Sequence, residues 1–510
     1  MLQIEHLTLT HTKDLRVLIS DLSLSLSGQD RLAVIGEEGD GKSTLLKVLF
    51  EYPDCPDFCQ MEGKITHPGE RMGYLSQEED LPGNLSVYAY CMTYPAFAQA
   101  SWEELATACA KTGLSDDLPY REALASTLSG GEKVRLRLTL LLLSSPTLLL
   151  LDEPSNDLDL EALEALEHFL LSCHLPVLFV SHDETLLSRC ATGVLHLESV
   201  YGKQTSRHTL AWIPYDDYVH DRLNHLRKQE QLYQSQQKEK RARDERFRKI
   251  EQAVAHAQES ISRQDPHSGR LLKKKMKAVK SLEHRFERED QNMVDRPNIE
   301  WSMDASWGEG ISLPQGKIIL DLDLPELRAG DRLLASPLRL HIRGPEKLLI
   351  VGKNGSGKTT LMRLLSDTFS HREDVHCVYF PQHYEELFPD HATPVTFLHT
   401  DGSKDQLTAI RTHLGALRFT REEMDHPISS LSGGQKAKLL LLRAILEKAD
   451  VLLMDEPTRN LSPLSAPVLR DMLLHFPGCV ICVTHDRLLI AAHSGRILRL
   501  TENGLVPWNP

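Results

Sequence analysis

A glycine-rich pattern, G-x-x-x-x-G-K-[ST], occurs twice in the sequence, at 36–43 and, 316 residues later, at 352–359. Each copy follows an apolar segment that we expect to form a strand (31–35 and 347–351) and precedes a segment that we expect to form a helix. In this context the glycines let backbone N–H groups curl around phosphate groups, and the helix N-terminus adds a favourable dipole. The lysine reaches the β/γ-phosphates, and the Ser/Thr hydroxyl takes Mg²⁺. The chain is therefore predicted to carry two phosphate-binding loops (P-loops).

Four further elements recur after each P-loop in the same order. They are a glutamine (Gln77, Gln382), the tetrapeptide Leu-Ser-Gly-Gly (128–131, 431–434), the tripeptide Asp-Glu-Pro (152–154, 455–457) and a histidine (His182, His485). The tetrapeptides, tripeptides and histidines are all separated by 303 residues. A single glutamate after an apolar strand is usually a solvated strand end, and a single histidine before aspartate usually belongs to a turn. Five elements in order, twice, instead indicate a duplicated α/β domain.

These motifs resemble those of ATP-binding cassette proteins. The resemblance implies an ATPase with ATP and Mg²⁺ as cofactors, in which two cassettes pair head to tail. Each ATP then lies between the P-loop of one cassette and the Leu-Ser-Gly-Gly of the other. The residues suit this arrangement, because Ser129 to Gly131 precede an expected helix whose N–H groups could bind a γ-phosphate. Glycines there also permit close backbone approach.

The resemblance assigns a role to each motif residue. The predicted nucleotide-binding residues of the first half are Gly36, Glu37, Glu38, Gly39, Asp40, Gly41, Lys42, Ser43, Thr44, Gln77, Ser129, Gly130, Gly131 and Glu132. Those of the second half are Gly352, Lys353, Asn354, Gly355, Ser356, Gly357, Lys358, Thr359, Thr360, Gln382, Ser432, Gly433, Gly434 and Gln435. The predicted Mg²⁺ ligands are Ser43, Gln77, Asp152, Thr359, Gln382 and Asp455. Glu153 and Glu456 would polarise the attacking water, while His182 and His485 would contact the γ-phosphate. Catalysis would rest mainly on positioning and charge neutralisation.

Two departures from the family pattern fall on one of the two sites. Site one combines the first P-loop with residues 432–435, and site two combines the second P-loop with residues 129–132. The first P-loop has Glu38 where the second keeps the usual Asn354, and Ser462 stands where the first half keeps Asp159. Since the segment after Asp-Glu-Pro of one cassette packs against the P-loop of the other, both changes affect site one. We therefore expect unequal sites. The adenine-stacking aromatic of such cassettes is not obvious: His11 lies near its place, or is an ordinary loop histidine.

Composition excludes several classes of protein. Of 510 residues, 41% are hydrophobic and 25% are charged, which is typical of a folded soluble protein. No run approaches the ~20 apolar residues of a membrane span, and the first residues lack the pattern of a signal peptide. We therefore expect a cytoplasmic protein without membrane insertion. The nine cysteines argue against a disulfide framework, and the pairs Cys55/Cys59 and Cys479/Cys482 have no second half for a zinc site.

The segment between the two cassettes differs from the rest in charge. Residues 222–288 contain 19 Lys/Arg and 9 Asp/Glu, which gives this segment a net charge of +10. Since the whole chain has a net charge of −14, the remaining residues carry −24. A helix is expected over 215–261, followed by a turn and a second helix from 271 to about 290. Apolar residues recur at steps of three and four in both, from Phe247 to Ile261 and from Leu272 to Phe286. The two helices are therefore predicted to form an antiparallel hairpin.

Basic residues crowd the tip of this predicted hairpin. They are Arg263, Arg270, Lys273, Lys274, Lys275, Lys277 and Lys280. A cluster of this kind suits a phosphate backbone, so we expect these residues to bind RNA. Only aliphatic residues are interleaved with them, which gives no support for reading a base sequence. Taken alone, the segment could also be a solvated coiled-coil spacer.

Tandem cassettes with a charged helical hairpin between them and no membrane span are similar to the ABC-F family. The expected fold is α/β, with two P-loop cassette domains (1–205 and 301–510) joined by a helical hairpin linker (206–300). The resemblance implies a ribosome-binding ATPase whose hairpin enters the ribosomal exit site, contacting rRNA and the P-site tRNA. It would protect against antibiotics or relieve stalling, with hydrolysis gating release, and would be a monomer with an intramolecular cassette pair. The alternatives are the ATPase subunit of an exporter and a DNA-associated cassette protein.

Overall fold

The computed structural model describes most of both cassettes and part of the linker. The described residues are 1–67, 69–77, 81–156, 158–200, 205–260, 277, 279–281, 285–286, 290, 313–382, 387–389, 391–399, 402–417, 419–431, 433–459 and 461–509. Contacts divide the chain into two compact units. One consists of Met1–Asp216 with Glu300–Pro510 and holds both cassettes, and the other is Asp217–Ile299. Of the predicted site residues, Ser432, Arg263, Arg270, Lys273, Lys274 and Lys275 lie outside the described residues.

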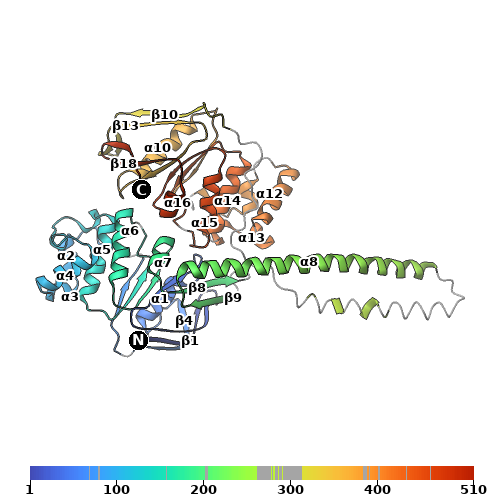
Figure 1. The fold of residues 1–510 in the computed structure, drawn as a ribbon, viewed down its shortest axis with the longest axis horizontal. Coiled ribbons are helices and arrows are strands. Elements are labelled where there is room, and N and C mark those ends of the chain that lie inside the picture. The colour runs from blue at the N-terminus through green and yellow to red at the C-terminus, as the bar shows by residue number, and fades with distance from the viewer. Residues whose placement is uncertain are drawn as a thin grey trace. The chain divides into compact units, whose positions relative to one another are not determined.

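The first cassette is built on a six-stranded sheet in the order β5-β6-β7-β3-β8-β9 (Figure 1). Its strands are β3 (Arg31–Ile35), β5 (Met72–Leu75), β6 (Leu148–Asp152), β7 (Val177–Val180), β8 (Gly193–Val200) and β9 (Thr205–Ala211). All neighbours are parallel except β8 and β9. Every residue of β6 and β7 is buried, as expected for parallel strands covered on both faces. The strand predicted at 31–35 is confirmed.

Helices and a second sheet cover this central sheet. The helices are α1 (Lys42–Glu51), α2 (Val87–Met92), α3 (Pro95–Gln99), α4 (Trp102–Thr112), α5 (Gly130–Leu143), α6 (Leu160–Ser172) and α7 (Glu184–Cys190), with 3₁₀ turns at Leu118–Tyr120 and Ala125–Thr127. The second sheet is antiparallel in the order β2-β1-β4 (Val17–Leu26, Leu2–His11, Cys59–Thr66). The helix expected after Ser129 is confirmed: Ser129 and Glu132 form a reciprocal capping box at the start of α5.

The second cassette repeats this design. Its sheet has the order β15-β16-β17-β14-β18-β19, with β14 (Lys347–Val351), β15 (Cys377–Phe380), β16 (Val451–Asp455), β17 (Cys479–Val483), β18 (Arg496–Thr501) and β19 (Gly504–Pro507). Two antiparallel pairs precede it, β10 (Ile318–Leu324) with β13 (Leu338–Arg343) and β11 (Leu327–Ala329) with β12 (Arg332–Ala335). The helices are α10 (Lys358–Ser370), α11 (Pro394–Leu398), α12 (Lys404–Ala416), α13 (Arg421–Asp425), α14 (Gly433–Leu446), α15 (Ala466–His475) and α16 (Arg487–Ala492), with a 3₁₀ turn at Ile428–Ser430. In each sheet the P-loop strand has the same position, which confirms the predicted duplication.

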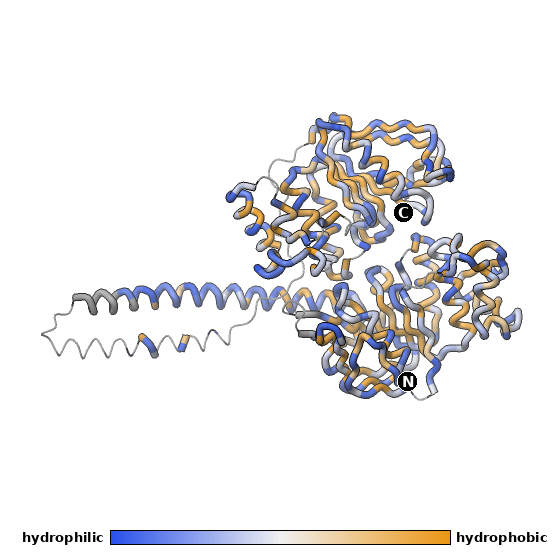
Figure 2. The backbone as a smooth tube through the Cα atoms, turned by 180° about the vertical axis from the view of Figure 1, so that it is seen from behind, coloured by the Kyte–Doolittle hydropathy of each residue, from blue (hydrophilic) through white to orange (hydrophobic). Residues whose placement is uncertain are grey.

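Hydropathy separates the sheets from the linker. Figure 2 shows apolar strands in both cassettes, whereas α8 (Tyr215–Ser260) is mostly hydrophilic along its length. Cys479 and Cys482 are buried thiols in β17, so this pair belongs to the core, as expected of cysteines in an apolar strand. Within the described ranges no cluster of His, Cys, Asp and Glu side chains is suited to hold a metal on its own.

The linker unit contains the predicted antiparallel hairpin. α8 forms its first arm, and residues 277, 279–281, 285–286 and 290 of the second arm are also helical. The rings of Phe247 and Phe286 meet edge to face with centroids 5.7 Å apart, and Arg243 donates a hydrogen bond to Asp290. One turn forward along α8, from 243 to 247, thus matches one turn back along the second arm, from 290 to 286. This register is antiparallel.

Candidate functional site

The first P-loop curls around its own lysine. Lys42 Nζ donates hydrogen bonds to the carbonyl oxygens of Gly36 and Glu37, at 2.8 and 2.9 Å. The loop needs glycine where it meets neighbouring backbone, because a Cβ on Gly36 would lie 2.4 Å from the Leu197 carbonyl oxygen. Gly41, immediately before α1, has φ +90° and lies against Leu18. The loop and the N-terminus of α1 therefore have the geometry of a phosphate cradle.

A carboxylate of β6 faces the first residues of α1. Ser43 Oγ donates to Asp152 Oδ1 at 3.0 Å, and Tyr74 OH donates to Asp152 Oδ2 at 3.4 Å. Burial raises the pKa of Asp152 to about 6, since the charged form loses its hydration. A hydroxyl and a carboxylate at the end of a P-loop form a ligand set that suits Mg²⁺, which completes its shell with water and substrate phosphates. Ser43 and Asp152 would therefore hold that ion.

The next residue, Glu153, is held by the predicted histidine. Glu153 Oε1 accepts from His182 Nε2 at 2.8 Å, and both side chains are largely buried. Burial alone would raise the pKa of Glu153, but the charges of His182 and Lys42 outweigh it and lower the pKa below its ordinary value. Glu153 and its counterpart Glu456 have φ of +50° and +52°, in the left-handed region that glutamate rarely adopts. Strained residues cluster at functional sites, so the same conformation in both cassettes supports the prediction that these glutamates are catalytic.

The second cassette has the same groups in a looser arrangement. Lys358 Nζ donates to the carbonyl oxygens of Gly352 and Lys353, at 2.8 and 3.1 Å. His485 Nε2 lies 3.8 Å from Glu456 Oε1, which is beyond hydrogen-bond distance. Burial lowers the pKa of His485 to about 3, with Lys358 adding to the effect, so its imidazole is neutral. Neither ring nitrogen of His485 has a hydrogen-bond partner within the described part of the chain.

The remaining predicted residues lie at the ends of these elements. Gln77 follows β5 and is exposed, whereas Gln382 follows β15 and is half-buried. Gly433 and Gly434 begin α14, and Gln435 donates to Glu423 at 2.8 Å. The pairing of each Leu-Ser-Gly-Gly segment with the opposite P-loop stays a prediction.

At each P-loop the structure shows a contact with a side chain of the other cassette that lies outside the Leu-Ser-Gly-Gly segment. The hydroxyls of Ser462 and Ser465, after the second Asp-Glu-Pro, donate to Glu37 Oε1 at 2.7 and 2.9 Å. At the other P-loop, Lys353 Nζ lies 3.1 Å from Glu161 Oε2 at the start of α6. The expected packing of this segment of one cassette against the P-loop of the other is thereby confirmed. Glu38, singled out in the sequence, is exposed, so the neighbouring Glu37 is the acidic residue built into the interface.

Sequence reasoning missed one residue beside the first P-loop. Arg16 Nη2 donates to the Gly39 carbonyl oxygen at 2.6 Å and anchors the turn after β1. Arg332 stands 316 residues later, at the spacing of the two P-loops, and this repeat could have identified the position. His11, the candidate for stacking on adenine, is the last residue of β1 before this turn, and its Nδ1 bonds Asp14 Oδ1 at 2.7 Å.

Two P-loops in duplicated α/β domains, each followed by a buried aspartate, a glutamate and a histidine, define an ATP-binding cassette ATPase. The family model described as ABC transporter matches residues 19–156 and 335–459. The tylosin resistance ATP-binding protein TlrC of Streptomyces fradiae is 31% identical, over 97% of this chain and 96% of its own. The ribosome protection protein VmlR of Bacillus subtilis is 28% identical, over 95% of this chain and 84% of its own. A crystal structure of the archaeal ribosome recycling factor aABCE1, in complex with the stalk protein aP1, shares the fold with a TM-score of 0.57 and 17% identity, over 98% of this chain and 90% of that one.

The chain belongs to the ABC-F family of tandem-cassette ATPases. Its cassettes therefore bind ATP. That the duplicated motifs form the nucleotide sites stays a prediction. Among the described residues, no helix has the length and apolar character of a membrane-spanning segment.

Proposed function

We propose that this protein is a ribosome-binding ATPase that acts on translation, protecting the ribosome from antibiotics or relieving stalling. The observation that carries the proposal is the basic antiparallel hairpin between two cassettes of ABC-F type. Two relatives, which are named as a tylosin resistance protein and a ribosome protection protein, support the proposal. The protein would work in the cytoplasm.

The hairpin supplies the surface for RNA. Residues 222–288 carry a net charge of +10, and the described tip residues Lys277 and Lys280 are exposed. Phosphate groups of rRNA or tRNA match this charge, since neutralising them releases condensed counterions. We propose that the hairpin enters the ribosomal exit site towards the P-site tRNA, and that its tip contacts RNA through phosphates rather than through base edges.

ATP would control when the protein stays on the ribosome. The two cassettes of one chain would close on two ATP–Mg²⁺ complexes, with Lys42 and Lys358 at the phosphates and Glu153 and Glu456 orienting water. Closure holds the bound state, and hydrolysis releases it. We propose a monomer with domain limits at 1–205, 206–300 and 301–510.

The proposal is tested by sedimentation with ribosomes. We expect the variant E153Q/E456Q to bind ATP but hydrolyse it slowly, and therefore to pellet with ribosomes in ATP and not in ADP. Adding K277E/K280E should weaken pelleting and reduce its dependence on salt. The control K111E/K404E reverses the same number of exposed lysines within the cassettes and should pellet unchanged. Absence of pelleting in ATP contradicts the proposal.

The description of the matching family model as a transporter favours one other function, the ATPase subunit of an exporter. That protein would need a separate membrane partner, and the basic hairpin has no role in it. Recovery of E153Q/E456Q with membranes rather than ribosomes would support the exporter. Tylosin susceptibility of cells expressing the active chain separates drug protection from a role in stalling without drug.

A further inference from the structure

The helices that follow the two catalytic motifs carry opposite charges at equivalent positions. The repeat offset of 303 residues relates position 167 to 470 and position 184 to 487. The first cassette has glutamate at both positions, in α6 and at the start of α7. The second cassette has arginine at both, in α15 and at the start of α16. Two equivalent positions are thus inverted in charge between halves that otherwise share their motifs.

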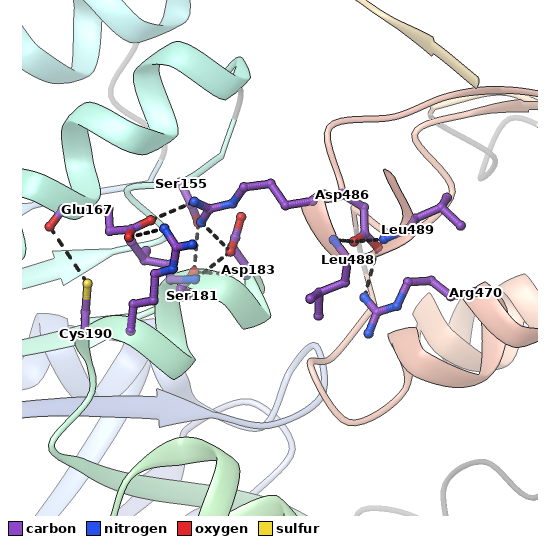
Figure 3. Close-up of polar contacts among 12 residues, drawn as sticks. Ser155, Glu167, Ser181, Asp183, Cys190, Arg470, Asp486, Leu488 and Leu489 are labelled. Atoms are coloured by element: carbon purple, nitrogen blue, oxygen red, sulfur yellow. Dashed lines mark hydrogen bonds and ion pairs between the residues drawn. The ribbon is translucent and has the colours of Figure 1, made fainter. Parts of the chain in front are cut away.

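These four side chains meet across the cassette boundary. Arg470 Nη2 donates to Glu184 Oε1 at 2.6 Å, and Arg487 Nη1 donates to Glu167 Oε2 at 2.7 Å. Glu184 contacts Arg470. In the second contact, Arg487 stands at the position equivalent to Glu184, and Glu167 stands at the position equivalent to Arg470. This reciprocal pattern is that of a two-fold interface, in which the same two positions contact each other twice. Figure 3 shows part of it, with Glu167 and Asp183 on one side and Arg470 and Asp486 on the other.

The network is buried and holds the turns that carry the site histidines. Exposure of the six charged side chains that cross or flank the boundary is 8–15%. Asp183, next to His182, caps α7 and also accepts from Arg487 at 3.0 Å. Asp486, next to His485, caps α16 and accepts from Arg470 at 3.0 Å. Each histidine turn is therefore fixed by an arginine of the second cassette.

The ionisation of the two glutamates differs. Burial raises the pKa of Glu167, but hydrogen bonds from Arg189 and Arg487 outweigh it and hold the pKa below its ordinary value. Burial raises the pKa of Glu184 to about 7 against the attraction of Arg470. Both glutamates are therefore ionised at pH 8, and variants that change their charge are compared at that pH.

The contacts between the cassettes at the two P-loops show the same inversion of charge. Glu37 of the first loop occupies the position of Lys353 in the second, at the loop offset of 316 residues. Glu37 accepts from two serines of the second cassette, whereas Lys353 lies against Glu161 of the first. Arg499 also donates to Glu161, at 2.9 Å. The first cassette therefore presents acidic side chains at every one of these contacts, and the second presents basic or hydroxyl groups.

We propose that this charge inversion specifies the pairing of the first cassette with the second, and that Arg470 and Arg487 are positioning residues which fix the two histidine turns together. Pairing of two first cassettes would place four glutamates together, and pairing of two second cassettes would place four arginines together. Buried like charges are strongly unfavourable, so both wrong pairings are excluded. The inference concerns ATP hydrolysis by the chain alone and holds whether or not the protein binds ribosomes.

The test compares two double variants of the full chain that have identical net charge. E184R/R470E exchanges the two partners of one contact, so opposite charges stay together at 184 and 470, but it removes the hydrogen bond from Arg470 to Asp486. E184R/R487E exchanges the two equivalent positions and places like charges together in both contacts. At pH 8 we expect E184R/R470E to lose part of the ATP turnover, because Asp486 loses its arginine. E184R/R487E should lose about tenfold more than that, because both contacts then join like charges. The loss should lie in kcat and not in KM for ATP, because neither position is in a P-loop.

A second exchange and a surface control complete the experiment. E167R/R487E likewise keeps opposite charges at 167 and 487, but it removes the hydrogen bond from Arg487 to Asp183 and places like charges at 167 and 189. Its turnover should therefore also lie between that of the unaltered chain and that of E184R/R487E. R411E, which reverses the exposed partner of Asp425 within the second cassette, should leave turnover unchanged within about twofold. Circular dichroism and gel filtration confirm that each variant is folded and monomeric. Equal turnover of E184R/R470E and E184R/R487E overturns the proposal, whether both are active or both are not. A higher activity of the partner exchange supports it.

Discussion

The two predicted ATP sites should lose activity unequally when their proposed catalytic glutamates, Glu153 and Glu456, are changed one at a time. We expect E456Q to remove most of the steady-state turnover and E153Q to leave most of it. The reason lies in the P-loops rather than in the glutamates. The first loop carries Glu37, Glu38 and Asp40 beside Lys42, whereas the second carries no carboxylate.

The magnitude can be worked from these charges. A unit charge about 10 Å from the triphosphate contributes about 1.7 kcal/mol at an effective dielectric constant of about 20, and about 0.4 kcal/mol in water. Asp40 accepts from the Glu37 N–H, and Glu37 accepts from Ser462 and Ser465, so hydrogen bonds reduce the effect of both charges on the triphosphate. Glu38 is exposed, so water screens its charge. Together the three should weaken ATP binding by about 2 kcal/mol, or about 30-fold. At the ATP concentration that half-saturates site two, site one is then almost empty.

Phosphate release measured across an ATP titration tests the argument. In the unaltered chain, turnover should rise in two phases separated by about 30-fold in ATP concentration. E456Q should abolish the phase at low ATP, and E153Q should abolish the phase at high ATP. E38N, which restores the residue found at Asn354, should move the second phase to lower ATP and leave the first in place.

One result would refute this reasoning. If E153Q and E456Q reduce turnover equally at every ATP concentration, the carboxylates of the first loop do not distinguish the sites. If E38N leaves the second phase at the same ATP concentration, the charge of Glu38 is fully screened from the triphosphate.

Three other contacts make separate predictions. The double change S462A/S465A removes both hydroxyl donors from Glu37, so the free energy of unfolding in urea should fall by about 1–3 kcal/mol, and an unchanged midpoint would contradict it. The pKa of Glu184 is about 7 in the folded chain against 4.5 for the unperturbed group, so the folded state holds an extra proton between these values and stability falls as the pH rises through this window. E184Q should lose this slope in thermal unfolding, and parallel curves would count against it. Burial raises the pKa of Asp152 to about 6, so Mg²⁺-dependent ATP binding at site one should weaken as the pH falls through 6; calorimetry that finds constant affinity from about pH 5 to 8 would exclude this role.

Much of the fold could be predicted because local signals agree with it. The strands at 31–35 and 347–351 are short aliphatic runs ending in a glycine loop, and the structure places β3 and β14 at these residues. The helix predicted over 215–261 is observed as Tyr215–Ser260, since no proline or glycine interrupts it. The edge strands β10 to β13 gave no such signal, because their pairing depends on the rest of the cassette.

The candidate site was predictable where a motif fixes both residue and geometry. Lys42, Asp152 and His182 lie where the duplicated motifs require them. The residues at the cassette boundary could not be found in this way. Arg470 lies in an ordinary amphipathic helix, and its partner Glu184 is 286 residues away. Nothing in the local pattern distinguishes such an arginine from a solvated one. The repeat offset relates Arg470 to Glu167, but only the structure shows that Arg470 contacts Glu184 of the other cassette.

Glu37 connects the inequality of the sites with the pairing of the cassettes. As a P-loop residue it adds negative charge beside the triphosphate, and as an interface residue it accepts from Ser462 and Ser465 of the second cassette. The departure at Ser462, where the family has an aspartate, removes a carboxylate that would otherwise face Glu37 at close range. Glu37 and Ser462 are therefore complementary, since a serine can donate to the glutamate and an ionised aspartate cannot. E37Q should accordingly tighten ATP binding at site one while weakening the contact with Ser462, so that affinity and cassette pairing change in opposite directions.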